Sequence, residues 1–128
     1  MKNSKIFINT KNGSYPILIG SELINNLEKI LKLYSIKSSK YLIIFDKNVP
    51  KKYIRIIKKK IKKKIILLKF LSSEKNKNQK SVNSILNILQ KNNFNRNDCV
   101  ISVGGGIIGD LTAFVSSIFK RGLKFVNV

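Results

Sequence analysis

The sequence predicts an α/β fold: a Rossmann-like, mostly parallel sheet with helices on both faces, opened by an N-terminal β-hairpin. Short apolar runs typical of buried strands alternate along the chain with amphipathic segments of helical period. Two strand-like runs flank Asn12-Gly13, a pair favoured in hairpin turns, near the start of the chain. The 128 residues show no repeat and no linker, so we expect one domain, residues 1–128.

The first half of the chain is expected to contain the hairpin, two helices and two buried strands. Ser21 is a candidate N-cap for the first helix, whose apolar stripe ends at Leu31. Pro50 stands near the start of the second helix, which is rich in lysine and extends to about Lys64. In chain order these elements are expected at residues 5–9, 14–19, 22–31, 41–45, 50–64 and 65–70.

The second half begins with a polar loop, residues 72–78, and continues with a helix, a strand, a glycine turn, a helix and a strand. The single cysteine, Cys99, lies inside the expected strand and has no partner for a disulfide, so we interpret it as an inert core thiol. These elements are expected at residues 82–92, 99–103, 104–110, 111–119 and 124–128.

The glycine turn is the most informative feature of the chain. Gly104, Gly106 and Gly109 have the spacing G-x-G-x-x-G between a strand and a helix, which is typical of dinucleotide-binding turns. Glycine permits positive φ and close approach to a ligand, and the N–H groups of a helix N-terminus attract phosphate. The turn is therefore predicted to hold a phosphorylated molecule, with a turn whose glycines serve packing alone as the alternative.

Acidic residues are scarce, and their positions are informative for that reason. No acidic residue follows Asp110, so a carboxylate that binds a ribose must come from earlier in the chain. Three of the six acidic residues, Asp46, Glu74 and Asp110, come just after expected strand ends, where parallel sheets bind ligands. Asp46 or Glu74 could accept hydrogen bonds from ribose hydroxyl groups, and Lys77 could form an ion pair with a phosphate. Each alone is also explained as a turn or cap residue.

The chain is strongly basic, with a formal net charge of +20, no histidine and a pI near 10.3. Such a charge suggests a nucleic-acid or membrane partner. However, the densest lysine run, residues 58–64, lies beside an apolar helical stripe, and Lys, Asn and Ile are all residues of A/T-rich codons. We therefore expect a solvated helix face and no nucleic-acid or membrane partner. No apolar segment approaches a membrane span and the N-terminus lacks the basic-then-apolar order of a secretion signal, so we also expect a cytoplasmic protein.

The glycine segment extends into a more specific pattern. Residues 104–115 read Gly-Gly-Gly-Ile-Ile-Gly-Asp-Leu-Thr-Ala-Phe-Val, and Arg121-Gly122 precedes the last strand. This resembles 3-dehydroquinate synthase over its N-terminal nucleotide-binding domain. The family's acidic loop, Asp-Gly-Glu-x-x-Lys, has its counterpart in residues 72–77, with Ser72 and Ser73 in place of Asp-Gly.

The resemblance implies a shikimate-pathway lyase that converts 3-deoxy-D-arabino-heptulosonate 7-phosphate to 3-dehydroquinate and phosphate, with NAD transiently reduced. It also implies a homodimer in which Arg121 reaches the substrate phosphate of the neighbouring subunit. No catalytic residue is expected in this chain. By correspondence with the family, the expected cofactor-binding positions are Asp46, Ser72, Ser73, Glu74, Lys77, Gly105, Gly106, Ile107, Ile108, Gly109 and Asp110, of which Ser72 and Ser73 depart from the family's residues.

The sequence departs from the family in its metal ligands. The family binds a divalent metal, Zn or Co, through a glutamate and two histidines of a helical domain, whereas this chain contains no histidine. We therefore expect a nucleotide-binding half-enzyme, inactive alone: a fragment, a decayed copy, or one product of a split gene with a separate C-terminal chain.

Two alternatives remain open at this stage. One is a related sugar-phosphate cyclase or a metal-dependent polyol dehydrogenase that shares the glycine turn. The other is a noncatalytic basic domain that binds nucleic acid or a partner protein.

Overall fold

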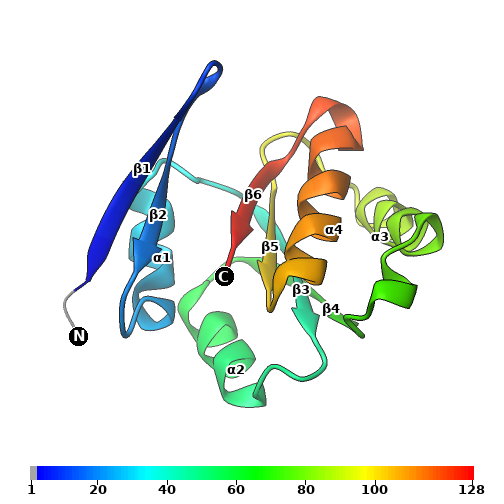
Figure 1. The fold of residues 1–128 in the computed structure, drawn as a ribbon, viewed down its shortest axis with the longest axis horizontal. Coiled ribbons are helices and arrows are strands. Elements are labelled where there is room, and N and C mark those ends of the chain that lie inside the picture. The colour runs from blue at the N-terminus through cyan, green and yellow to red at the C-terminus, as the bar shows by residue number, and fades with distance from the viewer. Residues whose placement is uncertain (1–2) are drawn as a thin grey trace.

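The computed structural model describes residues 3–128 as one four-stranded sheet flanked by helices, with a separate hairpin (Figure 1). Three short 3₁₀ turns lie at Ile24–Asn26, Glu74–Asn76 and Phe119–Arg121. The strands and helices are β1 (Ser4–Thr10), β2 (Gly13–Ile19), α1 (Leu27–Leu33), β3 (Lys40–Asp46), α2 (Lys51–Lys60), β4 (Lys64–Phe70), α3 (Gln79–Lys91), β5 (Cys99–Val103), α4 (Gly106–Ile118) and β6 (Lys124–Asn127).

The main sheet is parallel, in the order β4-β3-β5-β6. The chain first moves outward from β3 to β4, then returns past β3 to form β5 and β6. The crossovers therefore diverge between β3 and β5, and the carboxyl ends of these two strands flank the topological switch point, where open α/β sheets bind ligands.

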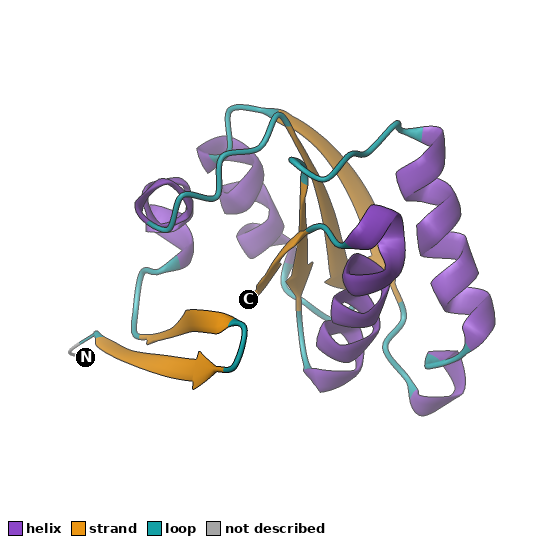
Figure 2. Ribbon diagram, turned by 90° about the horizontal axis from the view of Figure 1, so that it is seen from above, coloured by secondary structure: helices purple, strands orange, loops and turns teal. Residues whose placement is uncertain are grey.

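Helices cover both faces of this sheet, as predicted (Figure 2). Alternate residues of each strand point to opposite faces. Leu42 and Ile44 pack with α3 and α4 on one face. Tyr41 and Ile43 pack with α1 and α2 on the other. Both central strands are covered on two sides, which explains why β5 is buried throughout.

The hairpin is confirmed, and it forms a two-stranded antiparallel sheet of its own. Both views show it standing beside the main sheet (Figures 1 and 2). Ile6 pairs with Ile17 and Ile8 with Tyr15 on one face of the ribbon, where Ile6, Ile17 and Tyr15 are exposed. This face therefore contributes little to the core of the described chain.

Three boundaries differ from the sequence-based expectation. Ser21 does not cap a helix, because Glu22 has a left-handed φ of 62° and α1 begins only after the 3₁₀ turn at Ile24–Asn26. The lysine-rich helix ends at Lys60, because Ile61 turns to an extended conformation and is buried. Helix α4 begins at Gly106, so Asp110 lies inside its second turn and does not act as its N-cap.

Candidate functional site

The candidate site lies at the carboxyl edge of the main sheet, where the ends of β3, β4 and β5 meet. Asp46 is the last residue of β3, the loop of residues 71–78 follows β4, and the glycine turn follows β5. Because β3 lies between β4 and β5, the sheet order brings these three segments to one edge. The structure therefore brings together the candidate cofactor residues from three separate parts of the sequence.

Gly104, the first residue of the glycine turn, packs against the end of β3. Its φ of +150° favours glycine, and an added Cβ would lie 2.9 Å from Ile108 Cγ2 and 3.1 Å from Asp46 Cβ. The absence of a side chain lets the first turn of α4 pack against the end of β3. Gly104 thus places Asp46 directly beside the start of the helix.

Gly105 and Gly106 have a different role, because a Cβ at either position would meet nothing within 4 Å. No packing inside the described chain requires glycine there. Gly105 is the N-cap of α4 and supplies no side-chain cap. Within residues 3–128, the N–H groups of residues 105–108 have no hydrogen-bond acceptor. Four successive donors and open space at a helix N-terminus form a cradle suited to a phosphate group.

Asp46 supplies a carboxylate beside this cradle. The residue is 8% exposed, and its Oδ1 accepts a hydrogen bond of 2.7 Å from the Asn48 N–H. The nearby Ser72 hydroxyl, followed by the Asn48 N–H, lowers the pKa of Asp46 in spite of its burial. The Ser72 contact falls short of regular hydrogen-bond geometry, and Ser72 Oγ is buried without another partner in residues 3–128. Asp46 therefore remains an ionised acceptor at neutral pH.

The loop after β4 crosses toward the first turns of α4. Ser73 Oγ accepts a hydrogen bond of 3.2 Å from the Asn76 N–H and so caps the 3₁₀ turn that contains Glu74. Lys77 Nζ lies 2.9 Å from Asp110 Oδ2, which raises the pKa of Lys77. Both partners are well exposed, so the pair is weak and can open to admit an anion.

Arg121 is not brought to this edge. It follows α4, whose 13 residues span about 20 Å, so it lies at the opposite end of the helix from the glycine turn. Lys120, Arg121 and Gly122 have successive positive φ values of 46°, 68° and 106°. Within one chain, Arg121 therefore cannot share a ligand phosphate with the cradle.

The end of β6 also contributes to the site, which the sequence did not reveal. The Gly104 N–H donates to the Val128 carbonyl at 3.0 Å, and the Asn127 side chain lies against Gly109. No linear spacing signals these contacts, because they depend on β6 pairing with β5.

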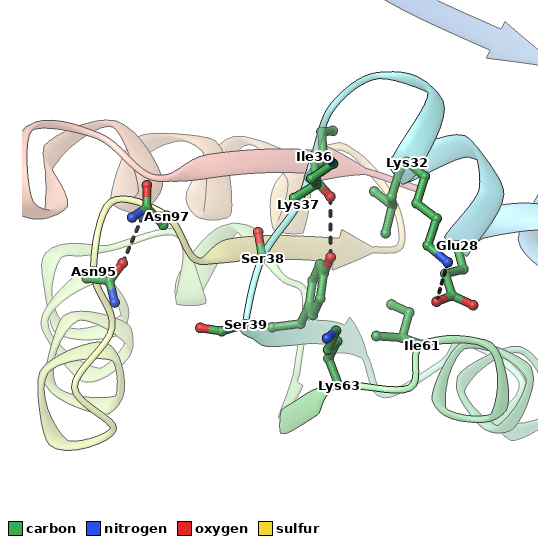
Figure 3. A pocket seen from close by; sticks show the side chains of 12 residues that line it. Glu28, Lys32, Ile36, Lys37, Ser38, Ser39, Ile61, Lys63, Asn95 and Asn97 are labelled. Carbon is green, nitrogen blue, oxygen red and sulfur yellow. Dashed lines mark hydrogen bonds and ion pairs between the residues drawn. The ribbon is translucent and has the colours of Figure 1, made fainter.

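A hollow of about 730 Å³ lies elsewhere, at the amino edge of the sheet (Figure 3). Leu31, Tyr41 and Ile61 form an apolar part of its wall, and Tyr41 donates to the Ile36 carbonyl at 3.5 Å. None of the candidate cofactor residues lines it. The hollow is therefore separate from the candidate site.

Two other expectations concern Cys99 and a membrane span. Cys99 is fully buried, and this burial raises the pKa of its thiol to about 12, as expected of an inert core residue. Within residues 3–128, no helix is long and apolar enough to cross a membrane.

The strand order and the helices on both faces define a doubly wound α/β domain with the cradle at its switch point. A family model described as "3-dehydroquinate synthase N-terminal" matches residues 67–128. The 3-dehydroquinate synthase of Pelagibacter ubique (strain HTCC1062) is 47% identical over 125 residues, which are 97% of this chain and 34% of that protein. That of Blochmanniella floridana is 33% identical over 97% of this chain and 35% of its own length.

The chain therefore belongs to the 3-dehydroquinate synthase family, and it spans about a third of the length of the curated relatives it matches. A crystal structure of 2-deoxy-scyllo-inosose synthase matches 98% of this chain and 35% of its own, with a TM-score of 0.86 and 18% identity. ValA, a 2-epi-5-epi-valiolone synthase from Streptomyces hygroscopicus subsp. jinggangensis 5008 with NAD⁺ and Zn²⁺ bound, matches 74% of this chain and 28% of its own, with a TM-score of 0.65 and 20% identity. At these identities the two structures show the shared fold.

Proposed function

We propose that this domain binds NAD for a 3-dehydroquinate synthase, which converts 3-deoxy-D-arabino-heptulosonate 7-phosphate to 3-dehydroquinate and phosphate. The observation that carries the proposal is the cradle of four free N–H groups beside an ionised Asp46 at the switch point. The relatives named 3-dehydroquinate synthase, and the cyclase of the same fold whose structure contains NAD⁺, support this choice of ligand.

The chain's own residues divide the binding task by chemistry. The N–H groups of Gly105, Gly106, Ile107 and Ile108 would donate to the pyrophosphate oxygens, aided by the helix dipole. Asp46 would accept hydrogen bonds from ribose hydroxyls. It occupies the end of the strand next to the glycine-turn strand, as the ribose-binding acid does in dinucleotide folds.

The loop after β4 would close over the same ligand. Glu74 is exposed and can reach hydroxyl groups, while Lys77 would move from Asp110 to a phosphate oxygen. Ser72 and Ser73 place hydroxyl groups where the family has a carboxylate and a glycine. The buried Ser72 Oγ, which has no regular hydrogen-bond partner within residues 3–128, is placed to donate near Asp46. When bound, NAD supplies reversible hydride acceptance from the substrate.

The divalent metal of the family does not fit these residues. The chain has no histidine, and no group of three or more potential ligands occurs within residues 3–128. We therefore assign no metal-dependent step to this chain and propose that the metal-bearing part of the reaction depends on other residues.

Arg121 is proposed to act across a homodimer. Its position at the far end of α4 excludes contact with the cradle of its own chain but leaves the guanidinium free to meet the substrate phosphate of a neighbouring subunit. The contact of Arg121 with substrate therefore depends on both the proposed substrate and the proposed homodimer.

Calorimetric titration of the chain with NAD tests the cofactor assignment, with ADP-ribose as a second ligand and random duplex DNA as a comparison. We expect saturable binding of both pyrophosphate-containing ligands, NAD and ADP-ribose, at 150 mM salt and no binding of DNA. Salt-dependent binding of DNA, with no heat of NAD binding, would instead support a noncatalytic basic domain.

A further inference from the structure

The side chain of Asn127, an exposed residue at the end of β6, lies so close to Gly109 that a side chain at position 109 would make a tight contact with it. A Cβ at Gly109 would lie 3.1 Å from Asn127 Oδ1 and 3.2 Å from Nδ2. Ser102, fully buried on β5, donates its hydroxyl to Asn127 Oδ1 at 2.6 Å. The amide of Asn127 is thus held from below by the sheet and lies against the first turns of α4.

The same strand end holds the other arm of the glycine turn. The Val128 N–H donates to the Ser102 carbonyl at 2.9 Å, and the Gly104 N–H donates to the Val128 carbonyl at 3.0 Å. Asn127 and Val128 therefore contact the turn before and after its free N–H groups. We refer to Ser102, Asn127 and Val128 as the β6 clasp.

We propose that Asn127 is a positioning residue for the pyrophosphate cradle, acting through Gly109, which rests on the proposed function of the domain. Hydrogen bonds weaken steeply when their angle departs from linearity. The direction of the N–H groups at 105–108 follows the tilt of the first turn of α4, and the clasp sets that tilt at Gly109 and Gly104. Asn127 thereby determines where the donors point without touching the ligand.

The clasp also explains why position 109, the third glycine of the G-x-G-x-x-G motif, is a glycine: the reason is packing against Asn127 and not the approach of a ligand. Gly105 and Gly106 face open space, whereas Gly109 is buried against the Asn127 amide. In an α-helix, alanine is normally more favourable than glycine, so the glycine at 109 is explained by its neighbour on β6. A change at Gly109 should therefore depend on residue 127, whereas a change at Gly106 should not.

The test compares Gly109→Ala, Asn127→Ala and the double variant, titrated with NAD, ADP-ribose and adenosine. We expect Gly109→Ala to weaken NAD and ADP-ribose alike by about tenfold, because its methyl group pushes the first turn away from Asn127. Asn127→Ala should weaken both by about threefold, and the double variant should bind like Asn127→Ala alone. Adenosine binding should not change in any variant. Asn9→Ala, in the exposed hairpin, is the matched control for loss of an asparagine side chain.

Amide chemical shifts of residues 105–108 provide a second readout that needs no ligand. Gly109→Ala should move these shifts, and adding Asn127→Ala should return them toward the values of Asn127→Ala. The proposal would be overturned if the loss of affinity in the double variant equalled the product of the losses in the two single variants, and if the amide shifts of residues 105–108 stayed displaced. A loss confined to NAD and absent for ADP-ribose would also overturn it, since Asn127 would then contact the nicotinamide half directly. Failure of the unaltered chain to bind NAD overturns the proposed function, and the chemical shifts still decide the geometry of the clasp.

Discussion

The four glycines of the turn are glycine for different structural reasons. These reasons predict whether a substitution disturbs packing or ligand binding. Gly104 is required by its positive φ and by contacts with Ile108 and Asp46, and Gly109 by Asn127. Gly105 and Gly106 meet no protein atoms within 4 Å of an added Cβ. The spacing G-x-G-x-x-G treats them as equivalent positions of one motif, while the structure separates packing from ligand approach.

Gly106→Val should leave the fold intact and weaken NAD binding by at least about tenfold, because the added side chain fills the space in front of the free N–H groups. Calorimetry measures the affinity, and thermal unfolding checks the fold. Ser117→Val, an exposed change near the other end of α4, is the matched control and should retain the affinity. A heat of NAD binding unchanged by Gly106→Val would remove the glycine turn from the site.

Asp46→Asn should reveal a pH-dependent contribution to stability. The pKa of Asp46 is lower in the folded chain than its ordinary value of 3.8, so ionisation favours the fold. This contribution is complete above the ordinary value and is lost as pH falls through the folded one. Urea unfolding at pH 6 should show the natural chain more stable than Asp46→Asn by on the order of 1 kcal/mol. Near pH 3 the difference should shrink, whereas a difference independent of pH would contradict the ionised state.

At the scale of elements, α2 shows where part of the lysine excess lies. Ile54 and Ile57 are buried against the sheet, while Lys58, Lys59 and Lys60 occupy its last turn with no acidic partner among the described residues. Helix α2 covers the face of the sheet opposite α4 (Figure 2). Lys58, Lys59 and Lys60 lie on the solvated side of an amphipathic helix, as the periodicity indicated, whereas Lys62, Lys63 and Lys64 are exposed beyond its end.

Charge reversal at Lys59, Lys60 and Lys63 should therefore change NAD affinity by less than about twofold at physiological salt, because exposed charges act weakly through screened solvent. Titration of the triple glutamate variant, with circular dichroism to confirm the fold, measures this. Loss of NAD binding would show that the lysine run belongs to the site.

At the scale of the molecule, a polypeptide of these 128 residues should not produce 3-dehydroquinate, with or without added zinc or cobalt. The described residues offer no metal-ligand cluster, and an open sheet edge cannot orient a sugar phosphate or exclude water from it. Phosphate release measured with this chain alone, and with a polypeptide that carries the metal ligands, tests the expectation. Turnover by this chain alone would refute it.

If the second polypeptide restores activity, Arg121→Ala should lower it by about tenfold or more, because a charge-assisted contact to the substrate phosphate is lost. NAD affinity should stay unchanged, since Arg121 lies at the far end of α4 from the cradle. A loss of NAD affinity in this variant would place Arg121 in the cofactor site instead.

The alternation of apolar runs and amphipathic segments determined most of the fold by itself. Buried strands such as β5 are read directly from their composition, and the Asn12-Gly13 turn marks the hairpin, because these signals are local. Local patterns could not locate the ends of helices. Residues such as Glu22 and Ile61 adopt their conformations through their neighbours in the fold, and the helix boundaries at these places were wrong.

From the glycine spacing and the scarcity of acidic residues, we also predicted that Asp46 or Glu74 and the glycine turn serve one ligand, which stays a prediction. Only the tertiary structure decided which residues meet beside the turn. The order β4-β3-β5-β6 sets Asp46 beside Gly104, and the pairing of β6 with β5 brings Asn127 onto Gly109. Arg121, close to these residues along the chain, is carried away by the length of α4. The physical reason is that strand order and helix length act over the whole sheet, and sequence spacing alone does not encode which strands become neighbours.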